Sequence, residues 1–342
     1  MPETSQRPDD EMGLLLAGIE TKASPLRALL GDTHARFAGV SDGAVADYIP
    51  ELAAADPNLF GLALTTVDGQ TFSVGDHDAP FTMQSLAKPF IYGLALEDNG
   101  LDQVMEAVGV EPSGDAFNAI ELNPQTNRPF NPMVNAGAIA TADLVSGPDL
   151  VSRTKRVNAV LARYAGQPLT IDQSVMLSER STSQRNRAIA LLMQSAGAVS
   201  DRAEESLELY TGVCSMTVTA DVLSVMAATL ANGGINPVTG EQALDARFVK
   251  QVLSVMFTCG MYDGAGAWSV QVGIPAKSGV GGGLLAVVPG RLGIGTFSPP
   301  LDTSGNSVRG MLAIEDLSNQ LGLHLLEPQP SDLVTDLRRT PR

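Results

Sequence analysis

Strand-forming segments lie near both ends of the chain, and helical periodicity fills the long segment between them. Residues 60–67 form an apolar run, and Asp68-Gly69 separates this run from residues 71–74, which is typical of a β-hairpin. Later strands are expected at 269–274, 284–288 and 292–297, followed by a helix at about 306–321. Because early and late strands can share one antiparallel sheet, this order predicts an α+β fold.

Apolar residues recur at helical spacing over roughly residues 82–258. The clearest groups are Val104/Met105/Val108, Ala188/Leu191/Leu192, Val222/Val225/Met226 and Phe248/Val252/Val255/Met256. Asn232-Gly233-Gly234 is typical of a helix end. These helices are expected to form a mainly helical lobe beside the sheet, with a cleft where the two meet.

The chain has no internal repeat and no linker between these segments. The polar residues 1–11 are expected to be disordered, and residues 327–342 to form a C-terminal tail. We therefore expect one two-lobed domain over residues 12–326. Its sheet lobe would comprise about 12–80 and 260–326, and its helical lobe about 81–259.

The composition excludes several classes of partner. The formal net charge is −16, whereas phosphate binding needs clustered Lys and Arg, so no nucleic acid is expected. The excess of acid indicates a solvated surface or, less directly, tolerance of salt. No run approaches the roughly 20 apolar residues of a membrane span, and the first residues are acidic where a signal peptide is basic. The chain is therefore expected to be cytoplasmic and to bind no membrane.

Cysteine and histidine are scarce. Cys214 and Cys259 are too few for a disulfide framework, and Cys259 is expected to be a buried small hydrophobe. His34, His77 and His324 show no metal-ligand spacing and no triad-like setting. We expect neither a metal nor an organic cofactor, and any nucleophile must use a base other than histidine.

A Ser-x-x-Lys motif is the most informative segment for chemistry. Pro89 fits only the first turn of a helix, so a helix should start near Ser85 and end at Asn99-Gly100. Residues three apart share a helix face, and a desolvated Lys88 can take the proton of the Ser85 hydroxyl. Taken alone, the motif also fits an N-capping serine beside a solvated lysine.

A second motif strengthens the catalytic interpretation. Lys277-Ser278-Gly279 has the pattern that accompanies Ser-x-x-Lys in class A β-lactamases and penicillin-binding proteins, and we expect it on a strand. The third motif of those enzymes, Ser-x-Asn between the other two, is absent, since the only Ser-x-Asn begins at Ser304. The sequence therefore indicates a β-lactamase/transpeptidase-like fold but not a lactamase.

Further segments resemble the serine-dependent glutaminase family over most of residues 35–320. The matching segments are 84–89, 111–114, 131–139, 178–180, 185–186, 225–234, 259–263 and 275–280. Between Glu179 and Asn186 the family usually carries a second acidic residue and Gly-Asp, whereas this chain has residues 180–184 as Arg-Ser-Thr-Ser-Gln at the same spacing.

The resemblance implies a serine amidohydrolase that converts L-glutamine and water to L-glutamate and ammonia. It implies that Ser85 is the nucleophile, that Lys88 is its base and that Tyr262 lies beside them. The backbone N–H groups of Ser85 and Val280 would form the oxyanion hole. It also implies a homodimer or homotetramer.

The same resemblance implies a substrate-binding set. The set comprises Asn135, Glu179, Asn186 and Tyr210, together with Ser85, Tyr262 and Val280, and the supporting residues are Gln84, Lys277, Ser278 and Gly279. The chemistry agrees, because Glu179 suits an ammonium and the neutral groups suit the carboxylate and amide oxygens of glutamine. Simpler interpretations remain: Asn135 could bridge helices, Glu179 could be surface charge and Tyr210 could belong to the core.

Two other functions are compatible with these motifs. One is a β-lactam- or D-Ala-D-Ala-processing enzyme, which the missing middle motif and the acidic N-terminus argue against. The other is a catalytically silent glutamine sensor, which would need neither Ser85 nor Lys88. Release of ammonia from glutamine distinguishes the three.

Overall fold

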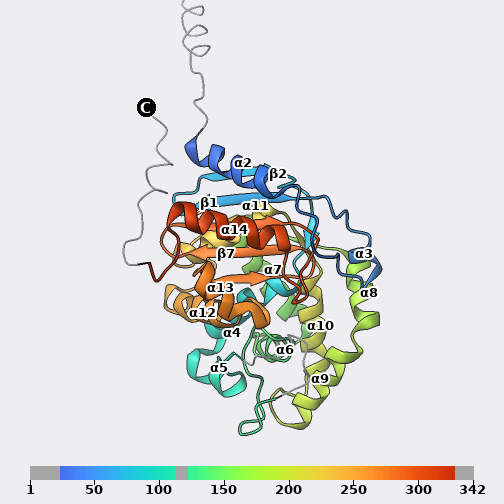
Figure 1. Cartoon of the computed structure of the whole chain (residues 1–342). Coiled ribbons are helices and arrows are strands. Elements are labelled where there is room, and N and C mark those ends of the chain that lie inside the picture. Colours follow the sequence, from blue (N-terminus) through green and yellow to red (C-terminus); the bar gives the residue numbers. More distant parts are fainter. Residues whose placement is uncertain (1–23, 113–121, 328–342) are drawn as a thin grey trace, which may run out of the picture.

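The computed structural model describes residues 24–112 and 122–327, which form an antiparallel sheet with helices on both faces and a helical region below it (Figure 1). The sheet order is β2–β1–β8–β7–β6, with every neighbouring pair antiparallel. The strands are β1 (Gly61–Thr66), β2 (Thr71–Gly75), β6 (Ala276–Ser278), β7 (Gly283–Val288) and β8 (Leu292–Phe297). Because β1 pairs with β8, early and late segments share one sheet, and the predicted α+β class is confirmed.

Both faces of this sheet are buried, and its side chains alternate between two cores. On one face, Leu62 and Leu64 pack with helices α2 (Pro25–Phe37) and α14 (Val308–Leu321), the latter lying in front of the sheet in Figure 1. On the other face, Ala63 belongs to the core that contains α11 (Ala220–Ala231). A Cβ on Gly295 of β8 would lie 2.4 Å from the carbonyl oxygen of Ala220, so α11 reaches the sheet only because this strand position lacks a side chain.

The remaining helices complete the fold, and most of them lie in the region below the sheet (Figure 1). They are α3 (Pro50–Ala53), α4 (Lys88–Asn99), α5 (Leu101–Ala107), α6 (Asn135–Asp143), α7 (Leu150–Ala165), α8 (Gln173–Thr182), α9 (Gln184–Ser195), α10 (Ala203–Cys214), α12 (Ala246–Cys259) and α13 (Ala265–Gln271). The start of α8 is fixed by the Asp172 carboxylate, which accepts from the N–H groups of Ser174 and Val175. Across the described ranges no helix has the length and apolarity to cross a bilayer.

A small second sheet, β3–β5–β4, positions the predicted nucleophile. Its strands are β3 (Phe81–Thr82), β4 (Thr170–Ile171) and β5 (Met216–Val218). The N–H of Met83 donates to the carbonyl of Met216 at 2.8 Å, and the chain then enters a 3-10 turn, η1 (Gln84–Ala87), that continues into α4. We expected only helices in this segment, because strands of two or three residues are too short to produce a detectable alternation.

The terminal elements largely match the prediction. The 60–74 hairpin, the strands at 284–288 and 292–297 and the last helix are confirmed, with α14 starting at Val308. The strand expected at 269–274 is wrong: its first residues end α13, and the strand that follows is β6. Trp268 and Val272 are buried four residues apart, which is helical spacing that a short apolar run can disguise.

The apolar face assigned to α9 is also wrong. Leu191 and Leu192 are 49% and 43% exposed, whereas Ile189 and Met193 are buried. Both pairs of positions fit a helical stripe, so spacing alone could not select the buried one. The predicted disorder at 1–11, residues 113–114 of the family-like segment 111–114 and residues 328–342 of the expected tail lie outside the described residues.

Candidate active site

A pocket of about 290 Å³ opens between η1, the loop that joins β6 to β7, and helices α6, α8, α9 and α10. Its lining residues are Tyr48, Gln84, Ser85, Asn135, Glu179, Thr182, Ser183, Arg185, Asn186, Tyr210, Thr211, Cys214 and Val280. The pocket therefore brings together predicted site residues that are spread from position 84 to position 280. Lys88 and Tyr262 do not line the pocket, but each contacts a residue that does. The 277–279 motif contacts Tyr262 through Lys277.

Ser85 lies in the 3-10 turn just before α4, so the helix start predicted near it is confirmed with one refinement: Lys88 is the first α-helical residue and Pro89 the second. The turn is entered through Gln84, whose φ of +49° is left-handed, a conformation that non-glycine residues seldom adopt. Such backbone persists only where the surroundings enforce it, and it often marks functional sites. Here it directs Ser85 into the pocket.

Lys88 is completely buried, and its Nζ donates to Oδ1 of Asn135 at 2.8 Å. Burial lowers the pKa of Lys88 from its usual 10.5 to about 7, against a smaller opposing effect of Cys214. A substantial fraction of Lys88 is therefore neutral near pH 7 and able to accept a proton. Asn135 in turn donates from Nδ2 to Oδ1 of Asn186 at 2.9 Å, so its side chain bridges the buried lysine and the pocket wall.

Tyr262 stands beside Ser85. It begins the 3-10 turn η2 (Tyr262–Gly264) with a left-handed φ of +56°, and its hydroxyl donates to the Ser278 carbonyl at 3.0 Å. The hydroxyls of Tyr262 and Ser85 are also hydrogen-bonded. Because the tyrosine proton points to Ser278, the tyrosine oxygen accepts from Ser85. Burial raises the pKa of Tyr262 above its usual value, so its hydroxyl is protonated at neutral pH.

The Lys-Ser-Gly motif lies on β6, as predicted, and Lys277 contacts Tyr262 directly. Its Nζ lies 3.9 Å from the centroid of the Tyr262 ring and donates to the Ser278 carbonyl at 2.7 Å. Lys277 is completely buried. Burial first, and the nearby charge of Lys88 second, hold the pKa of Lys277 well below its usual value.

The loop after β6 brings Val280 to the pocket. Gly282 donates to the carbonyl of Gly279 at 2.9 Å, which closes a tight turn around Val280. A Cβ on Gly281 would lie 2.8 Å from the Thr82 carbonyl oxygen, so the loop packs against the segment before η1 only because this residue is glycine. In the described parts of the chain, neither the Val280 nor the Ser85 N–H donates to another backbone carbonyl. Both residues line the pocket.

Glu179 lines the same pocket. Its Oε1 accepts from the Tyr48 hydroxyl at 2.9 Å, its carboxylate is also hydrogen-bonded to the side chain of Gln84, and burial raises the pKa of Glu179. It is therefore more than solvated surface charge. Tyr210 is 4% exposed but lines the pocket, and its hydroxyl is hydrogen-bonded to Cys214.

The sequence did not identify several residues that line the pocket. Among them, Tyr48 is hydrogen-bonded to Glu179 and Cys214 to Tyr210. Tyr48 lies in the loop before α3, 131 residues from its partner Glu179, and no periodicity or motif marks it. Burial and the nearby Glu179 carboxylate raise the pKa of Cys214 to about 12, so its thiol stays protonated and a poor nucleophile. Cys259 is buried, as expected, and lies outside this lining.

The segment that departs from the glutaminase pattern forms part of the pocket mouth. Thr182 and Ser183 line the pocket, while Arg180 points away and pairs with Glu208 of α10. Within residues 24–112 and 122–327, no group of three or more His, Cys, Asp or Glu side chains could hold a metal ion. The site offers hydroxyl, amine, amide and carboxylate groups for its chemistry.

Comparisons with known proteins agree with this geometry. The family model described as Glutaminase matches residues 43–326. A glutaminase of Trichormus variabilis is 55% identical over 309 residues, covering 90% of this chain and 92% of that protein, and one of Microcystis aeruginosa is 54% identical over 301 residues, covering 88% and 89%. The solved structure of the probable glutaminase ybaS superposes with a TM-score of 0.87 at 40% identity, covering 90% of this chain and 99% of that one. The crystal structure of Mglu in its glutamate form gives a TM-score of 0.85 at 45% identity, covering 89% and 71%. These neighbours confirm the expected β-lactamase-like fold.

Proposed function

Because the chain belongs to the glutaminase family and hydrolyses L-glutamine to L-glutamate and ammonia, we propose that Ser85 carries this reaction through a glutamyl-serine ester. The observation that carries the proposal is the position of the Ser85 hydroxyl, which is hydrogen-bonded to Tyr262 and precedes by one turn a buried lysine with a pKa of about 7. A serine needs such a base, since its own hydroxyl is a weak nucleophile.

In the first step, neutral Lys88 takes the hydroxyl proton while Ser85 Oγ attacks the side-chain amide carbon of glutamine. The backbone N–H groups of Ser85 and Val280 stabilise the oxyanion of the tetrahedral intermediate. The C–N bond then breaks, and the departing nitrogen receives a proton from Lys88, directly or through Tyr262, and leaves as ammonia.

In the second step, water attacks the glutamyl-serine ester. Neutral Lys88 takes the proton from this water, directly or through the Tyr262 hydroxyl, and the same N–H groups stabilise the second oxyanion. The ester C–O bond breaks, Ser85 Oγ regains its proton and L-glutamate leaves. No metal or organic cofactor enters either step.

The polar side chains of the pocket lining support recognition of a free amino acid. Glu179 would compensate the substrate ammonium, and Asn186 and Tyr210 would hold the carboxylate. Support comes from the hydrogen bonds of the Glu179 carboxylate, which come from the neutral side chains of Tyr48 and Gln84 rather than from a cation of the described residues.

Three expectations about organisation belong to the same proposal. We propose a single two-lobed catalytic domain over residues 12–326, with a sheet lobe and a helical lobe that share the pocket. We also propose a cytoplasmic location and a homodimer or homotetramer. Limited proteolysis, cell fractionation and light scattering, respectively, test these expectations.

A trapping experiment tests the catalytic proposal. The chain should release ammonia from L-glutamine, and Ser85→Ala should lose several decades of kcat while keeping its melting temperature. A diazoketone analogue of glutamine should label Ser85 covalently, and Cys214→Ala should be labelled equally well. Labelling of Cys214 would overturn the serine mechanism. Hydrolysis of a chromogenic cephalosporin without ammonia release would instead favour a β-lactam enzyme, and binding of glutamine without turnover would favour a sensor.

A further inference from the structure

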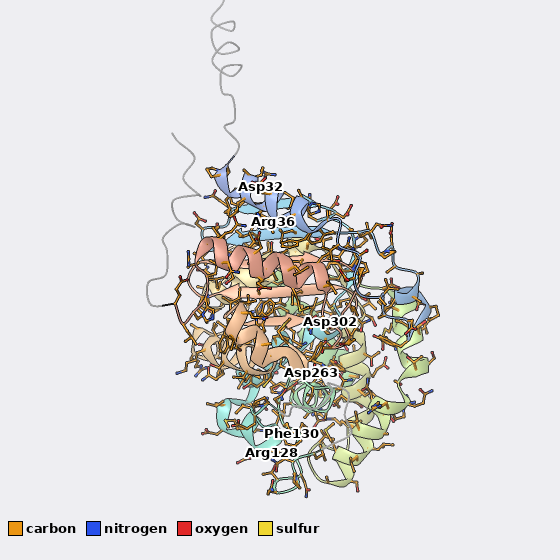
Figure 2. All side chains as sticks on the ribbon, viewed as in Figure 1. Asp32, Arg36, Arg128, Phe130, Asp263 and Asp302 are labelled. Atoms are coloured by element: carbon orange, nitrogen blue, oxygen red, sulfur yellow. The ribbon has the colours of Figure 1, made fainter. Side chains whose placement is uncertain are left out.

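A second and larger cavity is lined in part by Met261 and Gly264, which flank Tyr262 in the chain. Its volume is about 960 Å³, and it opens between the 42–46 loop, α13, the 301–306 loop and the start of α14. Figure 2 labels Asp302 and Asp263, which mark the loop after β8 and the turn η2 that bound this region. The volume is in the range of cavities that bind small organic ligands.

The walls of this cavity are largely apolar. The main apolar contributors are Trp268, Val272, Leu301, Val308, Met311 and Leu312. Trp268 is 5% exposed and fixed in place, because its Nε1 donates to the carbonyl of Ile274 at 2.8 Å. An occupant with a hydrocarbon or aromatic body would be favoured by such walls.

One buried polar group in the wall lacks a partner. Asn306 is 2% exposed, lines the cavity, and has a buried Oδ1 with no hydrogen bond. The position of Asn306 is not loose, because its N–H donates to the Asp302 carboxylate and its carbonyl accepts from the Asp302 N–H, both at 2.8 Å. Burying an acceptor without a donor is costly, so a ligand that brings a donor to this wall would relieve that cost.

The charged groups of the lining indicate which kind of hydrogen-bond donor the ligand carries. Asp42, Asp302 and Glu315 carry carboxylates into the cavity wall, and the described lining contains no Lys, Arg or His. A ligand that matches both the acceptors and the apolar walls therefore has an ammonium group on a hydrophobic body. We propose that this cavity is a binding site for a primary amine with an aromatic or aliphatic body.

Occupancy of the cavity would reach the active site through η2. Met261 and Gly264 line the cavity, and between them lies Tyr262 in its left-handed conformation. An occupant that presses on this turn moves the tyrosine hydroxyl relative to Ser85 and leaves Glu179, in the separate pocket, untouched. We therefore infer that the amine changes kcat for glutamine more than KM. This second half rests on the role proposed above for Tyr262.

The sole tryptophan of the 342 residues makes the binding half directly measurable. The full chain, held in saturating L-glutamate to fill the substrate pocket, is titrated with 4-phenylbutylamine while Trp268 fluorescence is recorded. We expect a saturable change, with 4-phenylbutanol binding at least about tenfold more weakly, because it has the same body without the charge. No saturable change, or equal affinities for amine and alcohol, would overturn the site.

Matched variants locate the binding. Glu315→Gln, Asp42→Asn and Asn306→Leu should each weaken the amine on the order of threefold to tenfold. Ser85→Ala should leave the fluorescence titration unchanged, so its outcome does not depend on whether Ser85 is the nucleophile. Unchanged affinity in all three cavity variants would place the amine elsewhere. A fluorescence change that follows protein concentration would assign the cavity to a second copy of the chain and would also overturn the proposal.

The coupling is tested separately by steady-state kinetics with and without the amine. We expect kcat to change by about twofold or more at unchanged KM, and the effect to disappear in Tyr262→Phe. A fluorescence response without any effect on kcat would leave the site in place and refute the coupling.

Discussion

The Nζ of Lys88 donates to Oδ1 of Asn135 at 2.8 Å in a fully buried setting, and burial brings the pKa of this lysine to about 7. The neutral amine is the form that accepts a proton, and its fraction grows as the pH rises. We therefore expect kcat/KM for glutamine to increase with pH through a midpoint near 7 and then level off.

Asn135→Asp tests this assignment by placing a carboxylate against the lysine. An opposite charge at this distance raises a lysine pKa, by about 1–3 units in comparable cases, so the midpoint should move to higher pH by at least about one unit. Asn186→Asp is the matched control, because Asn186 contacts Asn135 rather than Lys88, and its shift should be smaller. A midpoint that stays in place in Asn135→Asp would show that another group governs the profile.

Lys277 and Tyr262 share the Ser278 carbonyl as acceptor, and the lysine also lies over the tyrosine ring. Tyr262→Phe keeps the ring and removes the proton donor, so kcat should fall roughly 10²–10⁴-fold, the usual contribution of a positioned acid or base. Lys277→Met should also lower kcat, since the tyrosine loses the amine that packs over its ring and shares its acceptor. In a double-mutant cycle Lys277→Met should cost much less when Tyr262 is already Phe. If the fold-losses in kcat of the two single variants simply multiply in the double variant, Lys277 acts through a group other than Tyr262.

Gly281 allows the Val280 loop to pack near η1, since a Cβ there would meet the Thr82 carbonyl at 2.8 Å. Gly281→Ala should displace the Val280 N–H by a few tenths of an ångström. Complete loss of one oxyanion donor costs about 10²–10³-fold in kcat, so we expect a drop of at least about tenfold with little change in KM.

Gly31→Ala is the control for that substitution. Gly31 lies within α2 and its Cβ would meet nothing within 4 Å, so alanine should raise the free energy of unfolding by up to about 1 kcal/mol and leave kcat unchanged. Both variants are measured for kcat, KM and melting temperature. Equal kinetic effects of the two substitutions would show that the Val280 N–H is not part of the oxyanion hole.

Local signals account for what could be predicted from the sequence. The Asp68-Gly69 turn correctly predicted two strands. Pro89 correctly predicted a helix start close to Ser85 and Lys88. These features depend on neighbours within a few residues, which is the range over which propensity and periodicity act.

Features that depend on distant partners could not be predicted. Tyr48 becomes a site residue only because folding brings its loop to Glu179, and the two-residue strand at Phe81–Thr82 exists only because it pairs with β5. The short apolar run in α13 was compatible with either a strand or a helix. It forms a helix in which Trp268 and the following Val272 are buried. In each case, tertiary packing decided between local alternatives.

Glu179 accepts from the Tyr48 hydroxyl at 2.9 Å, and burial raises the pKa of this carboxyl. A raised carboxyl pKa means that the charge is lost as the pH falls through a value above the usual one. If this charge holds the glutamine ammonium, KM should rise at acidic pH and kcat should change less. Tyr48→Phe keeps the shape of the ring and removes only its hydrogen bond, so kcat/KM should fall by about tenfold or less.

Glu179→Gln removes the charge itself and should cost far more. Removing one partner of a buried hydrogen-bonded charge pair costs about 2–5 kcal/mol, so kcat/KM should fall on the order of 10²-fold or more. N-acetylglutamine, which lacks the ammonium, should be an equally poor substrate for the unmodified enzyme, yet acetylation should add little further loss in Glu179→Gln. The cycle is measured by ammonia release at a pH where Glu179 is ionised. If the two losses simply add, Glu179 does not contact the ammonium, and the amino-acid end of glutamine must lie toward Asn186 and Tyr210 in a different orientation.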